Sequence, residues 1–399
     1  MKSTITQTLE IPVKYTPDVL VVGGGFAGIA AALSAARMGK KVMLVEKSYY
    51  LGGLGTSGLV TIYLPICDGK GRQVSFGLAE ELLRLSVDVE LDGERGAEWL
   101  TGKPMTENDP RYEVNFNPAL FAISAEKALL SAGVEILYGV SLVSAVTENE
   151  KIQYAVLEGK SGRYAVEAKS YVDASGDADL ADRAGAPTAR FKYGNVVSAW
   201  YYYYDKTGYG LRMLGAVDLL PGMVPPEQLS KRRFSGLEDD DISEYMTLSH
   251  DRLYSTVLEK REKDKTHIPV SIASIPQLRM TRRIVGEYTF TLADERKEFS
   301  DSVGLYSNWR ERGPVYELPF RTLYSAKIKN LVCAGRCIST DDEMWEISRV
   351  IPCCSVMGEA AGIAAALSDD FASLDVSLIQ KELYLRGVKL HEAELPPLS

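Results

Sequence analysis

The chain has 399 residues, of which 46% are hydrophobic, and a formal net charge of −9. A chain of this length and composition can bury a large core and form two domains. Its acidic balance disfavours nucleic acid or an anionic membrane surface as the main partner, since both select for concentrated lysine and arginine. No stretch reaches the roughly 18 apolar residues that a membrane span needs, and residues 1–16 lack a signal-peptide core. We therefore expect no membrane span and a cytoplasmic location.

The first motif is a short apolar run, residues 18–22, that breaks into Gly23, Gly25 and Gly28 and continues as an alanine-rich helix. In a βαβ dinucleotide site, such glycines permit a sharp turn, let a pyrophosphate approach the backbone, and allow close packing of helix on strand. The N-terminus of the helix favours an anion. A second apolar run ends at Glu46. Its distance in sequence from Gly28 is close to the one at which a carboxylate of such a site binds a ribose. The pattern predicts a dinucleotide site that disfavours a 2′-phosphorylated cofactor.

Glycines are dense again at residues 52–58, too many for a helix. We expect a loop held against a flat or phosphorylated ligand. Residues 77–85 predict an amphipathic helix. Residues 92–111 are charged and contain proline and glycine, which indicates an excursion away from the core.

Asn117 and Pro118 predict the start of a helix that runs to Gly133, because asparagine is a good N-cap and proline suits the first turn. Residues 134–138 follow as a short strand. From 140 to 173 the sequence alternates between polar and apolar residues and is interrupted by turn residues, which predicts a three-stranded antiparallel meander.

The meander leads into an apolar strand ending at Asp173 and a turn of small residues at 174–177, which returns the chain to the nucleotide. Residues 187–324 have a different residue pattern, with long alternating stretches and a charged middle, which predicts a second domain of mixed strand and helix. They contain several arginines, for which a solvated surface is the ordinary interpretation. A late strand at 330–334 and a helix from Pro352, rich in small residues, complete the pattern.

Together these segments resemble FAD-dependent oxidoreductases of the glutathione-reductase-like group, in the branch near the fumarate reductase and succinate dehydrogenase flavoproteins. The resemblance is carried by VVGGGFAG at 21–28, Glu46, the glycine loop at 52–58, VDASGDADLA at 172–181, and the segments NLVCAGRCIS and RVIPCCSVMGEAAGIAAAL within 330–367. It implies an α/β fold: a Rossmann FAD-binding domain with a three-stranded β-meander, and a second mixed α+β substrate or cap domain.

The implied FAD-binding domain is discontinuous, comprising residues 1–187 and 325–399. Residues 188–324 would form the cap, and residues 60–116 are a further candidate part of it. The implied cofactor is non-covalently bound FAD. The expected FAD contacts are Gly23, Gly25, Phe26, Ala27, Gly28, Glu46, Lys47, Gly53, Leu54, Gly55, Thr56, Val140, Ser175, Gly176, Asp177, Gly335, Arg336, Ile351 and Gly358.

One residue departs from the pattern of the group. Many of its members carry an aspartate after the glycine of the late strand, whereas this chain has Arg336. An arginine cannot accept a hydrogen bond. It would instead salt-bridge a phosphate or point toward the substrate.

The chain carries one complete dinucleotide fingerprint, so we expect no separate NAD(P)H domain. The expected function is hydride transfer between flavin N5 and a small polar organic molecule, such as an unsaturated or hydroxy acid or a sugar derivative, bound between the domains. An arginine pair would suit a carboxylate, because a planar fork binds it in two places. The catalytic candidates are therefore Arg283, Arg336, Arg349 and Glu346, whereas the three histidines lie outside every cofactor motif.

Two other functional classes stay open. An oxygen-using flavin oxidase or hydroxylase would consume oxygen quickly when reduced. A non-enzymatic FAD-binding redox sensor would report oxidation through Cys353 and Cys354. The spacing of the five cysteines fits neither a disulfide framework nor a zinc site, so we expect small core residues and no metal. The oligomeric state is left open.

Overall fold

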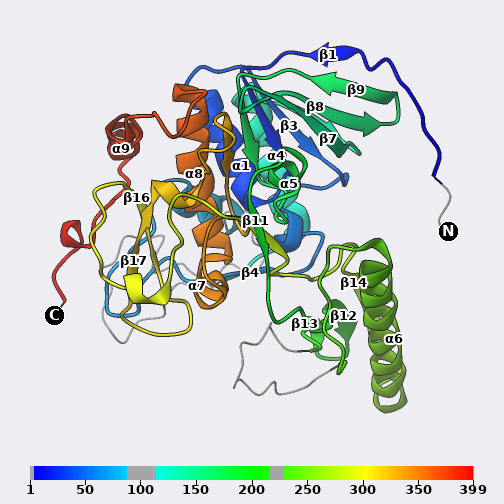
Figure 1. Cartoon of the computed structure of the whole chain (residues 1–399). Coiled ribbons are helices and arrows are strands. Elements are labelled where there is room, and N and C mark those ends of the chain that lie inside the picture. Colours follow the sequence, from blue (N-terminus) through cyan, green and yellow to red (C-terminus); the bar gives the residue numbers. More distant parts are fainter. Residues whose placement is uncertain (1–3, 88–110, 112–113, 216–228, 399) are drawn as a thin grey trace.

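The computed structural model describes residues 4–87, 111, 114–215 and 229–398, and its centre is a five-stranded parallel sheet (Figure 1). The strand order is β18–β10–β2–β3–β6. The strands are β2 (Val19–Val22), β3 (Val42–Glu46), β6 (Glu135–Tyr138), β10 (Ser170–Asp173) and β18 (Leu331–Cys333). All but β6 are buried along their whole length, as expected of parallel strands covered on both faces.

Successive side chains of β2 enter two different apolar cores, because neighbouring residues of a strand point to opposite faces. Val19 and Val21 pack on the helix side of the sheet. Leu20 and Val22 pack on the other side, against the meander. The helices of the first side are α1 (Phe26–Arg37), α2 (Leu78–Val87), α4 (Pro118–Ser131) and α8 (Ile351–Leu367).

The predicted meander is present as β7 (Ser141–Glu148), β8 (Lys151–Gly159) and β9 (Gly162–Val166), paired antiparallel in that order. A fourth strand, β1 (Val13–Tyr15), adds to β9 in parallel, which the sequence pattern did not indicate. The short strand β10 belongs to the central sheet and leads to α5 (Asp179–Arg183).

Helix α4 begins as predicted, because the Asn117 side chain accepts hydrogen bonds from the N–H groups of Ala119 and Leu120 and Pro118 follows at the first position. The predicted helix at 77–85 is α2. Strands β4 (Ile62–Tyr63) and β5 (Val114–Asn115) pair beside these helices. The predicted excursion at 92–111 lies outside the described residues, except for Arg111.

Helices α1 and α8 pack with their backbones in close contact. A Cβ atom added at Gly358 would lie 2.2 Å from the carbonyl oxygen of Ala27, and one at Gly362 would lie 2.2 Å from that of Ala31. The glycines of α8 therefore permit this contact, as the small residues of the helix predicted. Among the helices that the structure describes, none is by itself both long and apolar enough to cross a membrane. The pair α7 (Asp342–Ser348) and α8 satisfies length and composition together, with a bend of 91°.

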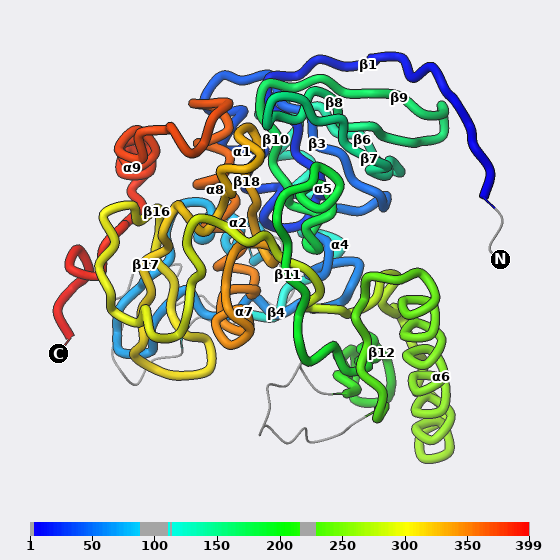
Figure 2. Tube along the Cα trace, viewed as in Figure 1, coloured from blue at the N-terminus to red at the C-terminus, as the bar shows by residue number. Residues whose placement is uncertain are grey.

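A smaller sheet and one long helix form a second group, which we call the α6 unit (Figure 2). Its sheet has the order β13–β12–β14, from β12 (Tyr201–Asp205), β13 (Gly208–Arg212) and β14 (Ile268–Ile272). Its helix is α6 (Asp239–Lys263). The unit has its own apolar core, which includes Val197, Tyr201, Phe234, Tyr245 and Leu278.

The rest of the predicted second domain lies elsewhere. Strands β11 (Thr188–Arg190) and β15 (Arg282–Ile284) pair with each other. The hairpin of β16 (Ser302–Ser307) and β17 (Val315–Pro319) packs on α8, and its side chains Val303, Tyr306 and Tyr316 join the core on the helix side of the central sheet. Helix α9 (Val376–Leu385) packs on α8 as well. All five cysteines are buried and free, as expected of small core residues.

Candidate functional site

A cleft of about 300 Å³ is lined by residues at the carboxyl ends of β2, β3, β10 and β18 and by residues of the α6 unit. This edge of a parallel sheet is where open α/β folds bind their ligands. Most residues expected to contact FAD line this cleft. They are Gly23, Gly25, Phe26, Ala27, Glu46, Lys47, Gly53, Leu54, Gly55, Ser175, Gly176, Asp177, Gly335, Arg336 and Ile351.

The turn between β2 and α1 needs its glycines for two separate reasons. Gly23 has a φ of 103°, which side-chain-bearing residues rarely adopt. A Cβ at Gly28 would lie 1.8 Å from the carbonyl oxygen of Gly23, so this position keeps helix and strand together. Gly28 does not line the cleft; it acts through packing.

Gly25 differs from both, because a Cβ added there would meet no atom within 4 Å and would enter the cleft. Gly25 is the N-cap of α1, and no side chain caps this helix end. The first N–H groups of the helix, at Phe26 and Ala27, lie in residues that line the cleft. This arrangement suits a pyrophosphate in close contact with the backbone.

Glu46 ends β3 with its carboxylate held in place beside the glycine turn. One oxygen accepts the Gly24 N–H at 2.7 Å, and the other accepts the N–H and hydroxyl of Ser48, both at 2.8 Å. A carboxylate offers about four acceptor positions, so capacity remains for a ribose hydroxyl. Val140 stands behind this residue and donates its N–H to the Glu46 carbonyl at 3.1 Å, outside the cleft lining.

The second glycine loop lies directly against the first. The Gly52 N–H donates to the Gly24 carbonyl at 2.8 Å, and Gly53 to Gly55 line the cleft. Thr56 is buried and turns inward, where its hydroxyl donates to the Leu51 carbonyl. The far end of the loop joins the α6 unit, because the Ser57 carbonyl accepts the Ser274 N–H at 2.8 Å.

The turn after β10 is organised by Asp173, which is fully buried. Its carboxylate accepts hydrogen bonds from the Ser175 hydroxyl at 2.6 Å and the Ala181 N–H at 2.8 Å. Burial raises the pKa of Asp173 despite these donors. The bonds fix Ser175 and Gly176 at the edge of the cleft.

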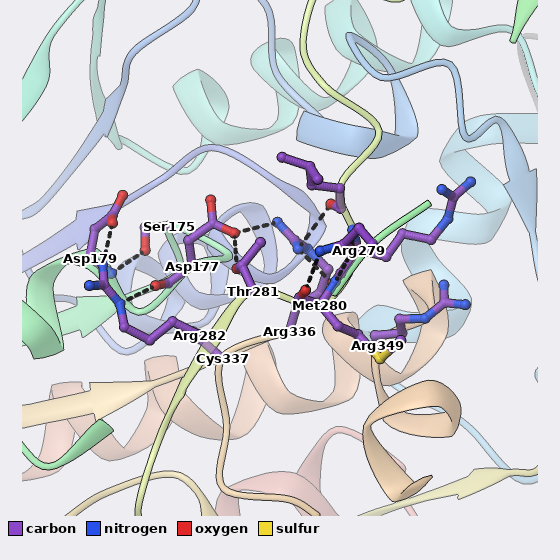
Figure 3. Close-up of polar contacts among 12 residues, drawn as sticks. Ser175, Asp177, Asp179, Arg279, Met280, Thr281, Arg282, Arg336, Cys337 and Arg349 are labelled. Carbon is purple, nitrogen blue, oxygen red and sulfur yellow. Dashed lines mark hydrogen bonds and ion pairs between the residues drawn. The ribbon is translucent and has the colours of Figure 1, made fainter. Parts of the chain in front are cut away.

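Arg336 bridges the late strand, the turn after β10 and the α6 unit (Figure 3). It donates to the carbonyls of Arg279 at 2.7 Å and Leu278 at 3.2 Å, and its other terminal nitrogen lies 3.4 Å from the Asp177 carboxylate. A Cβ at Gly176 would lie 2.3 Å from this guanidinium group. Arg336 therefore links the end of β18, the turn after β10 and the α6 unit around the cleft.

Arg349 and Glu346 lie at the junction of α7 and α8. The Glu346 carboxylate is 1% exposed and accepts hydrogen bonds from Arg349 at 2.8 to 3.0 Å and from Arg310 at 2.5 Å. Arg349 lines the cleft, whereas Glu346 lies behind it and holds the arginine in place.

Arg283 lies apart from the other catalytic candidates. Its guanidinium group stacks over Trp345, pairs with Asp342 at 3.3 Å and donates to the Thr340 carbonyl. Burial lowers its pKa. Gly358 is likewise outside the cleft lining, in the contact between α1 and α8.

Sequence reasoning did not single out the residues that line the cleft from the α6 unit. These are Gly236, Ile242, Ile275, Pro276, Leu278 and Arg279. Arg279 stood out only as one of a run of arginines, and nothing in the pattern separates it from Arg282, which pairs with Asp179 and Asp182. The histidines lie elsewhere: His267 is buried between Tyr201 and Asp205, and His391 pairs with Glu317.

Three observations indicate that these residues fit the expected FAD. Gly25 leaves open space where the pyrophosphate must approach the backbone. The N-termini of α1 and α8 lack side-chain caps, and both supply residues to the cleft. The Glu46 carboxylate stands at the end of β3. Donors for phosphates and an acceptor for a ribose are thus present in one cleft.

Comparison with known proteins gives the same cofactor. The family model described as FAD dependent oxidoreductase matches residues 18–195 and 242–383. A thioredoxin reductase of Ureaplasma parvum is 35% identical over 72 residues, 18% of this chain and 23% of that protein. An iron–sulfur subunit of the CoB–CoM heterodisulfide reductase from Methanopyrus kandleri is 49% identical over 53 residues, 13% of this chain and 8% of that protein.

These matches span less than a quarter of the length of the curated relatives. Among solved structures, a p-nitrophenol 4-monooxygenase from Pseudomonas putida aligns over 92% of this chain and 84% of its own, with 13% identity and a TM-score of 0.48. The family model covers most of the chain. The chain therefore belongs to the FAD-dependent oxidoreductase family, and it is an enzyme whose cofactor is FAD.

Proposed function

We propose that this enzyme transfers a hydride between FAD and a small organic molecule bound between the parallel-sheet domain and the α6 unit. The observation that carries the proposal is the cleft itself, because the glycine turns line one side of it and the α6 unit lines the other. FAD supplies the two-electron chemistry, and the protein supplies binding, orientation and the exclusion of water.

The proposed fold assignment is a glutathione-reductase-like FAD-binding domain with the α6 unit as its cap. The meander between β6 and β10 and the late return of β18 to the central sheet support it. In this proposal Gly25 and the α1 N-terminus hold the pyrophosphate, Glu46 holds the ribose, and the loop at 53–55 approaches the ring system. Gly28 and Gly358 support the site through packing.

The cap in this proposal is smaller than the 188–324 expected from the sequence. The core of the α6 unit draws on residues from Val197 to Leu278, whereas Phe290, Val303 and Tyr316 pack in the core of the central sheet. Residues 290–324 are therefore better assigned to the FAD-binding domain.

The test is an anaerobic titration of the purified holoenzyme with a panel of metabolites. The absorbance of the bound flavin is followed, which is lost on reduction and recovered on reoxidation. At least one small molecule should reduce or reoxidise the flavin stoichiometrically. Rapid oxygen consumption with peroxide release by the reduced enzyme would instead favour an oxidase or hydroxylase. A flavin that no metabolite reduces or reoxidises would contradict the proposal.

A further inference from the structure

Part of the cleft lining, which we call the apolar wall, consists of aliphatic side chains. Val60, Ile62 and Leu64 line it from the segment after the glycine loop, and Ile242, Ile275 and Leu278 line it from the α6 unit. All but Leu278 are only partly buried. Leu64 and Ile242 also pack against the apolar cores on the two sides of the cleft. This wall suits a hydrocarbon or aromatic group.

Two arginines line the same cleft. Arg349 ends α7, and Arg279 lies in the segment between β14 and β15. In Figure 3 the guanidinium groups of both point to the same side, away from the Asp177 carboxylate that Arg336 faces. Arg279 is 1% exposed and its guanidinium group lies over the Trp200 ring at 5.2 Å. Both cations are thus held in fixed positions by the fold.

The charges around Arg349 do not balance within its cluster. Glu346 is one buried carboxylate shared by two arginines, Arg310 and Arg349. Arg349 uses its Nε and one terminal nitrogen on Glu346, and its Nη1 has no partner among the residues that the structure describes. A carboxylate at this nitrogen would give the two arginines of the cluster a second anion.

We propose that the substrate is an organic acid with an apolar body: its carboxylate binds at Arg349, and its body lies against the apolar wall. This inference rests on the proposed function and names the substrate class of the same site. It favours an acid over a sugar derivative, since a sugar would bury hydroxyl groups against aliphatic side chains. Glu346 is a positioning residue, which orients Arg349.

The test measures binding to the oxidised holoenzyme without turnover, as the change in flavin absorbance during titration. The probes are hexanoate and cinnamate, their primary amides, and malate as a compact hydrophilic acid. Each apolar acid should bind about 10- to 100-fold more tightly than its amide, because charge-assisted hydrogen bonds contribute about 1.5–3 kcal/mol. Malate should bind more weakly than either apolar acid.

Arg349→Gln should remove most of the preference for acid over amide, and Arg349→Lys should restore part of it. Arg321→Gln is the matched control, because it removes the same charge from a half-exposed arginine paired with Asp301. It should leave the preference intact. The wild-type ratio alone is decisive should Arg349→Gln fail to fold.

Equal affinity for acid and amide, no binding of either acid at millimolar concentration, or an unchanged preference in Arg349→Gln would overturn the inference. These outcomes differ from failure of the proposed function. A flavin that no metabolite reduces, in an enzyme that still prefers apolar acids, contradicts the function alone. A flavin that metabolites do reduce, with no preference for acids, contradicts the substrate class alone.

Discussion

Gly25 and Gly28 lie in the same turn but meet different surroundings. Gly25 has an ordinary extended conformation, with φ −71° and ψ −179°, and its missing side chain leaves space in the cleft. We expect Gly25→Val to keep the stability of the apoprotein and to weaken FAD binding about tenfold or more. Gly28→Ala should instead lower the free energy of unfolding by about 1–3 kcal/mol, because its Cβ would collide with the Gly23 carbonyl.

Denaturation of the two apoproteins and titration with FAD would separate these effects. Wild-type FAD affinity in Gly25→Val would contradict the assignment of the pyrophosphate to this turn. Equal losses of stability in both variants would show that Gly25 acts through packing too.

Glu359 is a buried carboxylate on α8 that accepts the Leu78 N–H at the start of α2, at 2.7 Å. Burial raises its pKa to about 6. Since the folded state binds this proton more tightly than the unfolded state does, stability falls as pH rises from about 4.5 to about 6. The loss amounts to about 2 kcal/mol from this group.

Glu359→Gln keeps an acceptor for the Leu78 N–H and removes the titration. The difference in unfolding free energy between wild type and variant should therefore shift by about 2 kcal/mol in favour of the variant between pH 4.5 and pH 7. Chemical denaturation across this range measures it. A difference that is constant with pH would contradict the raised pKa.

The residues of the glycine motifs and of the late strand and helix could be predicted from the sequence, whereas most residues that the α6 unit brings to the cleft could not. The glycine turn and Glu46 belong to a single βαβ unit, whose spacing is set by backbone geometry. Arg349 was among the predicted catalytic residues, but Arg279 lines the same cleft from a separate segment that carries no recognisable signal. Arg283 belongs to the same run of arginines as Arg279, yet its guanidinium group stacks on Trp345 outside the cleft.

At the scale of elements, the contact between α1 and α8 determines where two helix N-termini meet the cleft. Gly358→Ala should stabilise an isolated helix by about 1 kcal/mol, because alanine has the higher helix propensity. In the folded protein its Cβ would lie 2.2 Å from the Ala27 carbonyl, so the helices must separate. We expect a net loss of about 1–3 kcal/mol in unfolding free energy, together with weaker FAD binding.

Denaturation of the apoprotein shows whether Gly358→Ala raises or lowers the free energy of unfolding. This sign decides whether helix propensity or the contact with the Ala27 carbonyl dominates. A gain in stability would contradict the close contact between the helices. Gly362→Ala offers an independent repeat one turn further along α8, since its Cβ would lie equally close to the Ala31 carbonyl.

The elements themselves differed in how far the sequence predicted them. The start of α4 and the three-stranded meander carry local signals, a cap with proline in one case and turns between alternating runs in the other. Strand β1 has no such signal, because three residues form a strand only by pairing with β9. The hairpin of β16 and β17 could not be assigned to a domain from its own residues, since its partner is α8.

At the scale of the molecule, the central sheet and the α6 unit have unequal cores. The core on the helix side of the sheet draws on segments from most of the chain, including α1, α8 and the hairpin. In contrast, only Tyr245, Ser249, Leu253 and Val257 of α6 are buried along its 25 residues. Because local opening requires less free energy where fewer apolar groups are buried, the α6 unit should open before the central sheet.

Amide hydrogen exchange tests this difference directly. Amides of α6 and β14 should exchange about tenfold or more faster than those of β2, β10 and α8. Adding FAD to the apoprotein should slow exchange at the N-terminus of α1 and in the glycine loop at 52–58, where the cleft meets the backbone. A substrate that bridges the cleft should in addition slow exchange around Arg279, because it ties the α6 unit to the central sheet. Exchange from α6 as slow as from β2 would contradict the unequal stability, and unchanged exchange around Arg279 would place the substrate outside the cleft.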